Sequence, residues 1–317
     1  MKVIDLIRDT ASVPFSFEVL PPLKGNGTAG LFDTIDRLRE FQPRYINITA
    51  HRSEYVYNEL PSGLLQKQRI RRRPGSIAVA AAIQRRYDIP VVPHLVCSGN
   101  TREDLEYTLI DLQFLDISDL LVLRGDKARD ERTFQATGDG PVHATELIEQ
   151  INRFNQGVFF DGSPIRQPGV PFTFGVACYP EKHEEAPNLE ADLQVLLRKT
   201  QMGAQYAVTQ LFYDNERYFE FVRQAHALGI TIPIVPGIKP LTKLNQISVI
   251  PKTFHCDLPE SLHQEVLRCH TDEEVRQVGI EWATAQCREL LRQGVPNLHF
   301  YSMGAVDSIC EIARRIY

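Results

Sequence analysis

The chain has 317 residues, of which 43% are hydrophobic, so it can bury a large core, and its length suits one α/β barrel as well as two smaller domains. Lysine and arginine total 35 against 40 for aspartate and glutamate, which gives a net charge of -5. This balance argues against a nucleic acid or an anionic membrane as partner. We therefore expect a small-molecule partner.

The sequence has no feature of an exported or membrane protein. Met1 to Asp9 alternates charged and apolar residues, and no segment approaches the roughly 18 uncharged apolar residues of a membrane span. The six cysteines form no Cys-x-x-Cys pair, and the cluster from His255 to His270 fits no structural zinc spacing. We expect a cytoplasmic protein without a metal site and without a disulfide scaffold.

Eight short apolar runs occur along the chain, and a helical pattern follows each of them. An uninterrupted apolar run is typical of a strand that is buried on both faces of a parallel sheet. The expected strands are Phe15 to Leu20, Tyr45 to Thr49, Val91 to Cys97, Leu120 to Leu123, Phe172 to Tyr179, Tyr206 to Phe212, Ile232 to Ile238 and Leu298 to Met303.

Helix boundary signals agree with this alternation. Thr101 to Asp104 and Thr271 to Glu274 resemble capping boxes, and Asn188 can cap the helix that follows it. Gly229 and Gly294 each end a helical pattern just before a strand. Eight strand-helix units without an internal linker predict a single (β/α)8 barrel over residues 1–317, a fold of about 250 residues plus insertions.

The surplus length falls in three segments. Lys127 to Gly140 and Asn155 to Pro171 are rich in Gly, Pro, Asp and Gln, which predicts long loops around a helix from Thr145 to Phe154. The third insertion runs from Leu241 to Thr271, before the last long helix.

Polar residues stand at the carboxyl ends of nearly all the expected strands, where α/β folds bind ligands. In Asp119 to Asp126 the apolar run ends in Arg-Gly-Asp: arginine can meet a phosphate or carboxylate, and glycine lets a ligand approach the backbone. Together these strand ends suit a flat, polar-edged heteroaromatic ligand. The residues are Glu18, Thr49, His94, Arg124, Asp126, Tyr179, His183, Gln210 and Lys239.

Several motifs together resemble the methylenetetrahydrofolate reductase family, and they run in that family's order along nearly the whole chain. The length resembles the short bacterial form. The motifs are Phe15-Ser-Phe-Glu-Val-Leu-Pro-Pro22, Pro93-His-Leu-Val-Cys97, Leu123-Arg-Gly-Asp126, Tyr179-Pro-Glu-Lys-His183, Thr209-Gln-Leu-Phe-Tyr-Asp214, Pro236-Gly-Ile238 and Leu298-His-Phe-Tyr301.

The resemblance implies a flavoenzyme with tightly bound FAD. NADH or NADPH reduces the flavin, which then passes hydride to 5,10-methylenetetrahydrofolate and gives 5-methyltetrahydrofolate for methionine synthesis. By the same resemblance, Glu18 is the general acid that protonates N10 of the folate, and Asp126 stabilises the developing iminium charge. For that role Glu18 must be protonated near neutral pH, which requires a raised pKa. The resemblance also implies self-association.

The resemblance assigns further contacts residue by residue. Glu18, Asp126, Gln210 and Gln246 match substrate-binding positions. The positions that match FAD contacts are Thr49, His94, Arg124, Gly125, Asp126, Ala144, Tyr179, His183, Asp192, Arg198 and Lys199. Asp192 and Lys199 are seven residues apart, hence on one face of a helix.

One departure stands out, because Ala305 occupies a position where the family commonly has a substrate-holding arginine. Lys239, Lys243 or the cluster Arg69 to Arg73 could supply a cation instead, although such a cluster is usually a solvated face. Gly25-x-Gly-x-x-Gly30 matches a dinucleotide-binding pattern, but Pro21 and Pro22 separate it from the strand. Two other functions remain open: a barrel lyase or aldolase using Lys239, and a flavin- or folate-binding protein without turnover.

Overall fold

Every apolar run that was predicted to be a strand contains one. The large sheet is formed by β1 (Phe15–Val19), β2 (Ile46–Ile48), β5 (Val91–Val96), β6 (Asp119–Leu123), β7 (Thr173–Cys178), β8 (Tyr206–Thr209), β9 (Ile234–Val235), β10 (Gly237–Ile238) and β11 (Leu298–Tyr301). The computed structural model describes residues 2–128 and 131–317, without the side chains of Tyr55 and Arg69. Two predictions therefore fall partly outside the described residues: the loop Lys127 to Gly140, at 129–130, and the basic cluster, at the Arg69 side chain.

The strand order is that of a closed parallel sheet. It reads β10-β11-β1-β2-β5-β6-β7-β8-β9. Its two ends, β9 and β10, are consecutive pieces of one strand interrupted by Pro236, which has no N–H to give to a ladder. Counting them together leaves eight strand positions, each followed by a helix, and the chain has the predicted (β/α)8 barrel fold.

The helices alternate with these strands. They are α1 (Val3–Arg8), α2 (Ala29–Leu38), α3 (Ser76–Arg86), α4 (Arg102–Phe114), α5 (Ala144–Asn155), α6 (Leu189–Gln201), α7 (Asn215–Ala227), α8 (Gln246–Phe254), α9 (Glu260–Leu267), α10 (Asp272–Arg292) and α11 (Val306–Ile316), with a short 3-10 turn, η1 (Arg39–Phe41). None of the helices in the described residues is both long enough and apolar enough to cross a lipid bilayer.

The predicted helix boundaries are confirmed by their hydrogen bonds. Thr101 and Thr271 each accept from the backbone of the third residue of their helix in a full capping box. Asn188 accepts from the N–H of Ala191. Gly229 and Gly294 have φ values of 86° and 74°, the left-handed conformation that ends a helix at low cost for glycine.

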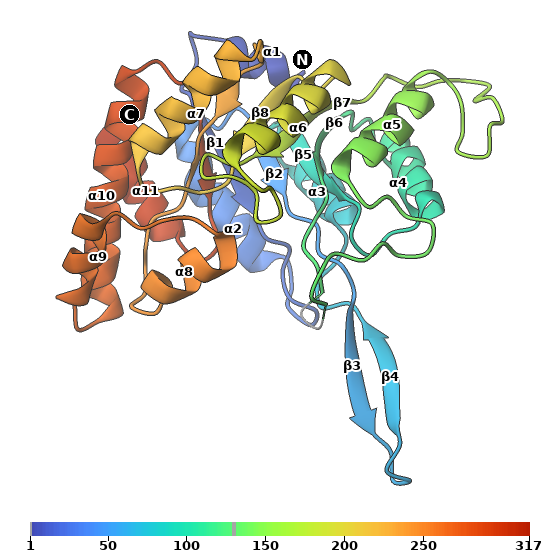
Figure 1. Ribbon diagram of the computed structural model, residues 1–317, viewed down its shortest axis with the longest axis horizontal. Helices are drawn as coiled ribbons and strands as arrows, with labels where there is room; N and C mark the ends of the chain where they lie inside the picture. Colours follow the sequence, from blue (N-terminus) through green and yellow to red (C-terminus); the bar gives the residue numbers. More distant parts are fainter. Residues whose placement is uncertain (1, 129–130) are drawn as a thin grey trace. The chain divides into compact units, whose positions relative to one another are not determined.

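The chain divides into two compact units, which are described separately. The first unit contains the residues up to Val19, Asp33–Asn47 and Thr173–Tyr317, and the second contains Leu20–Phe32 and Ile48–Phe172. In the first unit β10, β11 and β1 pair in parallel, as do β7, β8 and β9, and the C-terminal helices α10 and α11 lie side by side (Figure 1). In the second unit β5 pairs in parallel with β6.

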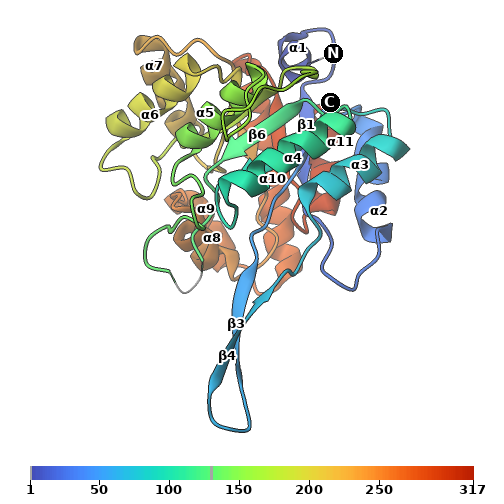
Figure 2. The same ribbon diagram turned by 90° about the vertical axis from the view of Figure 1, so that its right-hand side faces the viewer.

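The second unit carries a hairpin that the sequence reading missed. Its strands, β3 (Glu54–Glu59) and β4 (Leu65–Ile70), pair only with each other in an antiparallel ladder. The hairpin extends away from helices α3, α4 and α5 of its own unit, as two views at right angles show (Figures 1 and 2). Tyr57, Leu64 and Leu65 are more than half exposed near its tip.

The insertion from Leu241 to Thr271 is more ordered than a long loop. It contains α8 and α9, whose apolar side chains Ile250, Leu262 and Val266 are buried in one cluster with Leu241 and Val275 of α10. Burial of these side chains supplies the stabilisation that short helices lack in water.

Candidate active site

Strand β1 has one apolar and one polar face. Because side chains alternate along a strand, Phe15 and Phe17 share one face, and the Phe15 ring packs against Phe300 with centroids 5.4 Å apart. Ser16 and Glu18 share the other face. The Ser16 hydroxyl lies 2.8 Å from Nδ1 of His299, and its oxygen accepts from the Asn297 amide at 2.6 Å. In the first unit, Ser16, Asn297 and His299 therefore form a polar layer on the N-terminal side of Glu18 along β1.

Glu18 is buried and held at the backbone. It is 6% exposed, and its carbonyl oxygen accepts from the hydroxyl and the N–H of Ser302. Burial raises the pKa of the Glu18 carboxyl to about 8, and the nearby Lys239 ammonium opposes part of that rise. Glu18 is therefore mainly protonated at neutral pH. The raised pKa that an acid role requires is present, and its cause is burial.

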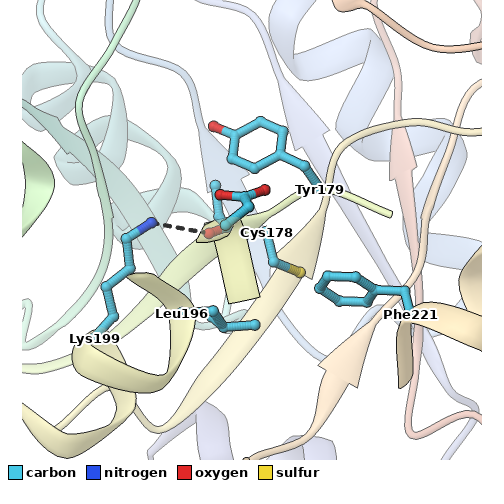
Figure 3. A pocket seen from close by; sticks show the side chains of 7 residues that line it. Cys178, Tyr179, Leu196, Lys199 and Phe221 are labelled. Atoms are coloured by element: carbon cyan, nitrogen blue, oxygen red, sulfur yellow. Dashed lines mark hydrogen bonds between the residues drawn. The ribbon is translucent and has the colours of Figure 1, made fainter. Parts of the chain in front are cut away.

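A recess in the first unit is lined by three of the predicted FAD-binding residues, Tyr179, Asp192 and Lys199. Figure 3 shows Lys199 of α6 reaching the carbonyl oxygen of Ala177, to which its ammonium donates at 3.3 Å. Tyr179, at the end of β7, stands on the same rim and packs edge-on against the His183 ring, with centroids 4.8 Å apart. The recess is lined by Ala177, Cys178, Tyr179, Asp192, Leu196, Lys199 and Phe221.

Asp192 joins this recess to the His183 loop. Its carboxylate accepts from the backbone N–H of His183 at 2.9 Å, and burial raises its pKa, with Lys199 opposing the rise. Asp192 and Lys199 therefore do lie on one helix face, as their spacing predicted. Arg198 is on α6 as well, but its side chain is exposed and does not line the recess.

The two predicted substrate glutamines differ in how much they are engaged. Gln210 follows β8 directly, is partly exposed, and its side-chain oxygen accepts from the N–H of Leu211. Gln246 is the first residue of α8, and its side-chain oxygen accepts from the N–H groups of Thr242 and Lys243. Through these two hydrogen bonds the Gln246 side chain stabilises the loop before α8.

In the second unit, two histidines and a threonine gather beyond β2 and at β5. The Thr49 hydroxyl lies 3.2 Å from Nε2 of His51. His94 is 6% exposed, and burial, with a smaller effect of His51, lowers its pKa to about 3. The His94 imidazole is therefore neutral at physiological pH. His51 was not assigned a role from sequence, although it stands two residues after Thr49 and so on the same side of an extended chain.

Arg124, Gly125 and Asp126 follow β6 as predicted. The Arg124 guanidinium lies over the Phe134 ring at 5.0 Å. Gly125 has φ 80°, and a Cβ there would be 2.5 Å from the Ser98 hydroxyl, so this turn requires glycine. Asp126 is exposed and lies near enough to His51 to raise its pKa, although burial lowers it overall. Ala144 is a buried residue at the start of α5.

A separate hollow in the second unit, about 80 Å³ in volume, contains none of the predicted site residues. It is lined by Arg102, Glu149, Gln150, Arg153, Val158 and Phe160.

Ala305, where the family's arginine is missing, is the N-cap residue of α11 and is 2% exposed. A long cation could not be placed at this position without displacing its neighbours. Among the strand-end residues, the buried cation closest to Ala305 in the sequence is Lys239. It is 6% exposed and lies beside Glu18.

Comparison with known proteins decides the family. The profile of the family described as methylenetetrahydrofolate reductase matches residues 3–317. The chain belongs to this family. Methylenetetrahydrofolate reductase (NADH) 1 of Arabidopsis thaliana is 28% identical over 316 residues, which cover 97% of this chain and 49% of that protein. The chain thus spans about half the length of this curated plant relative.

A bacterial member of the methylenetetrahydrofolate reductase family is closer in length. The 5,10-methylenetetrahydrofolate reductase of Salmonella typhimurium is 28% identical over 293 residues, covering 92% of this chain and 86% of that protein. Among solved structures, a Clostridium thermocellum protein described as binding two copies of 5-methyl-5,6,7,8-tetrahydrofolic acid aligns with a TM-score of 0.58 and 15% identity, over 99% of this chain and 96% of that one. At this identity the likeness supports the barrel fold alone.

Proposed function

We propose that this chain is an FAD-dependent reductase that converts 5,10-methylenetetrahydrofolate to 5-methyltetrahydrofolate with NADH or NADPH as reductant. Membership of the methylenetetrahydrofolate reductase family supports the reaction class. The observation that carries the proposal is Glu18, a buried carboxyl at the end of β1 whose pKa is raised to about 8. A proton donor of this kind is what opening the folate ring requires.

Glu18 supplies a proton at the correct pH. With a pKa of about 8, roughly nine-tenths of the carboxyl groups are protonated at pH 7. Transfer of this proton to N10 breaks the bond between N10 and the methylene carbon, and leaves an iminium ion on N5 that can accept hydride. The hydride and one proton are together consumed in each turnover. Asp126, an exposed carboxylate, is the proposed partner of the iminium charge and of the pterin edge.

Each unit, taken by itself, has residues that fit polar parts of FAD. When bound, FAD carries hydride from the nicotinamide to the folate. The recess of the first unit presents a cation, a carboxylate and two aromatic rings, a donor set that suits a phosphate, a ribose and an adenine. The neutral His94 and the Arg124 cation suit a ring system with both uncharged and anionic edges. The proposed FAD contacts are Thr49, His94, Arg124, Gly125, Asp126, Ala144, Tyr179, His183, Asp192, Arg198 and Lys199.

Several wider assignments belong to the same proposal. They are a single catalytic domain over residues 1–317, substrate contacts from Gln210 and Gln246, cytoplasmic location, self-association, and a role in one-carbon metabolism that supplies methyl groups for methionine synthesis. The resemblance to the family supports each of them.

Two half-reactions test the proposal separately. Purified protein loaded with FAD is bleached by NADH without oxygen, and methylenetetrahydrofolate is then added. We expect the oxidised flavin spectrum to return. In Glu18→Gln bleaching should persist while reoxidation slows by about 10²- to 10⁴-fold, since only the second step needs the proton. The exposed Glu281→Gln is the matched control. Loss of both half-reactions to the same degree would remove Glu18 from this role.

Lys239 also keeps a second function open. Burial lowers its pKa to about 8, and a lysine of this kind can form a Schiff base with a carbonyl substrate, as in barrel lyases and aldolases. Borohydride added with pyruvate or an aldehyde would trap such an adduct as a mass increase on the peptide that contains Lys239. The reductase proposal expects no adduct.

A further inference from the structure

Lys239 is an unusual residue for the end of a barrel strand, because a lysine side chain is rarely buried. It follows β10 directly and is 6% exposed. Its ammonium donates to the carbonyl oxygen of Met303 at 3.4 Å. Met303 stands next to Ser302, the residue that holds the Glu18 carbonyl. The segment after β11 therefore contacts both residues: the Met303 carbonyl accepts from the Lys239 ammonium, and the Ser302 hydroxyl donates to the Glu18 carbonyl oxygen.

Strand register places Lys239 level with Glu18. Glu18 pairs with Tyr301 across β1 and β11, and Ile238 pairs with Phe300 across β10 and β11. One residue further along, Lys239 stands level with Tyr301 and so with Glu18. Since side chains alternate along each strand, these three side chains share one face, on the layer above Ser16 and His299. The Tyr301 hydroxyl donates to the Thr209 carbonyl at 2.6 Å.

We propose that Lys239 is a positioning residue of this site, a buried cation that weakens the hold of the Glu18 carboxyl on its proton so that the proton can pass to the substrate near neutral pH. This inference rests on the proposed reductase function. After the transfer, the Lys239 ammonium stabilises the carboxylate that remains, until a proton from water restores the acid.

The electrostatics agree with this geometry. Burial raises the pKa of Glu18 to about 8 and lowers that of Lys239 to about 8, and each group opposes the change in the other. Burial raises the pKa values of Tyr301 and of its neighbours Tyr45 and Cys178, so these three groups stay uncharged at neutral pH; the His299 ring lies in the layer beside Ser16. Without the cation, Glu18 would keep its proton to higher pH and would be a weaker acid.

The first test is the pH profile of flavin reoxidation by methylenetetrahydrofolate. In Lys239→Met the alkaline limb should move to higher pH by about 1–3 units, the usual effect of removing an opposite charge at short range. The rate at pH 7 should fall a few-fold, because the acid is weaker. Lys239→Arg keeps a cation and should restore the limb toward the wild-type position, and the exposed Lys252→Met should leave it unchanged. An alkaline limb that stays in place or moves to lower pH in Lys239→Met would overturn the proposal.

The second test titrates Glu18 directly and needs no turnover. Infrared difference spectra of the flavin-free protein follow the carboxyl band that Glu18→Gln removes, and its midpoint should be higher in Lys239→Met than in wild type. Lys239→Gln is a second neutral variant, in case Lys239→Met does not fold. If wild type fails to reduce folate but the midpoint moves, the reductase function is wrong and the action of Lys239 on Glu18 stands. If wild type is active and the midpoint does not move, the inference alone is wrong.

Discussion

The burial that raises the pKa of Glu18 should also make the folded protein less stable as the pH rises. Folding raises the pKa of this carboxyl from 4.5 to about 8. Between these two values the unfolded chain has released a proton that the folded chain keeps, so the folded state binds more protons and the free energy of unfolding falls with pH. Glutamine at this position neither binds nor releases a proton, and its contribution should be independent of pH.

The expected effect is large for a single side chain. At about 1.4 kcal/mol per pKa unit, the rise from 4.5 to about 8 corresponds to roughly 5 kcal/mol as an upper bound. Buried sites behave as more polarisable than a dry interior, so we expect about 2–5 kcal/mol. Below pH 4.5 the carboxyl is protonated in both states, and glutamate and glutamine should then differ little in their pH dependence.

Urea unfolding between pH 5 and pH 8 measures this effect. The comparison is best made in a Lys239→Met background, because the titration of the buried lysine would otherwise overlap that of Glu18. The added Glu18→Gln change should raise the free energy of unfolding progressively from pH 5 to pH 8, whereas Glu281→Gln in the same background should not. If the free energies of unfolding of the glutamate and glutamine proteins differ by the same amount at pH 5 and at pH 8, Glu18 is not a buried acid.

Three further outcomes follow from single contacts. Lys199→Met should weaken FAD binding about tenfold, a loss of about 1.4 kcal/mol, because it removes the cation of the recess. The exposed Lys252→Met should not weaken it. Flavin fluorescence titration measures FAD binding by both variants. Gly125→Ala should lower thermal stability by about 2 kcal/mol or more, since φ is 80° and the new Cβ would meet Ser98, and Ser98→Gly should recover part of the loss. Ala305→Arg should destabilise the fold by about 2 kcal/mol or more, because the position is 2% exposed; unchanged stability together with a lower KM for folate would show that the arginine reaches the substrate instead.

The strands of the large sheet could be predicted because burial on both faces leaves a continuous apolar run, as in Leu120 to Leu123. Helix ends could be predicted because capping needs particular side chains, such as Thr101 and Asn188. The hairpin was missed for the opposite reason. None of the side chains described in its strands is buried, so no continuous apolar run marks them, and Pro61-Ser-Gly63 was a signal for the turn between them.

The sequence could name candidate site residues, which stay predictions, but it could not predict their electrostatic arrangement. The sequence identified Glu18 and the need for a raised pKa, but it could not show that burial is the cause, since burial depends on strands far apart in the chain. Lys239 appeared as a strand-end cation without a role, because its register with Glu18 arises through β11. The grouping of Asp192 with Lys199 was predictable, since it needs helical periodicity alone.

The β3–β4 hairpin offers a place to cut or extend the chain. Its hydrogen-bond ladder involves no other strand of the described residues, so an interruption at the tip breaks none of the pairings that define the barrel. Exposed loop tips with small residues tolerate new termini and inserted domains, and Pro61-Ser-Gly63 has this composition. A circularly permuted protein that begins and ends here, or one with a fluorescent protein inserted here, should therefore fold with the barrel intact.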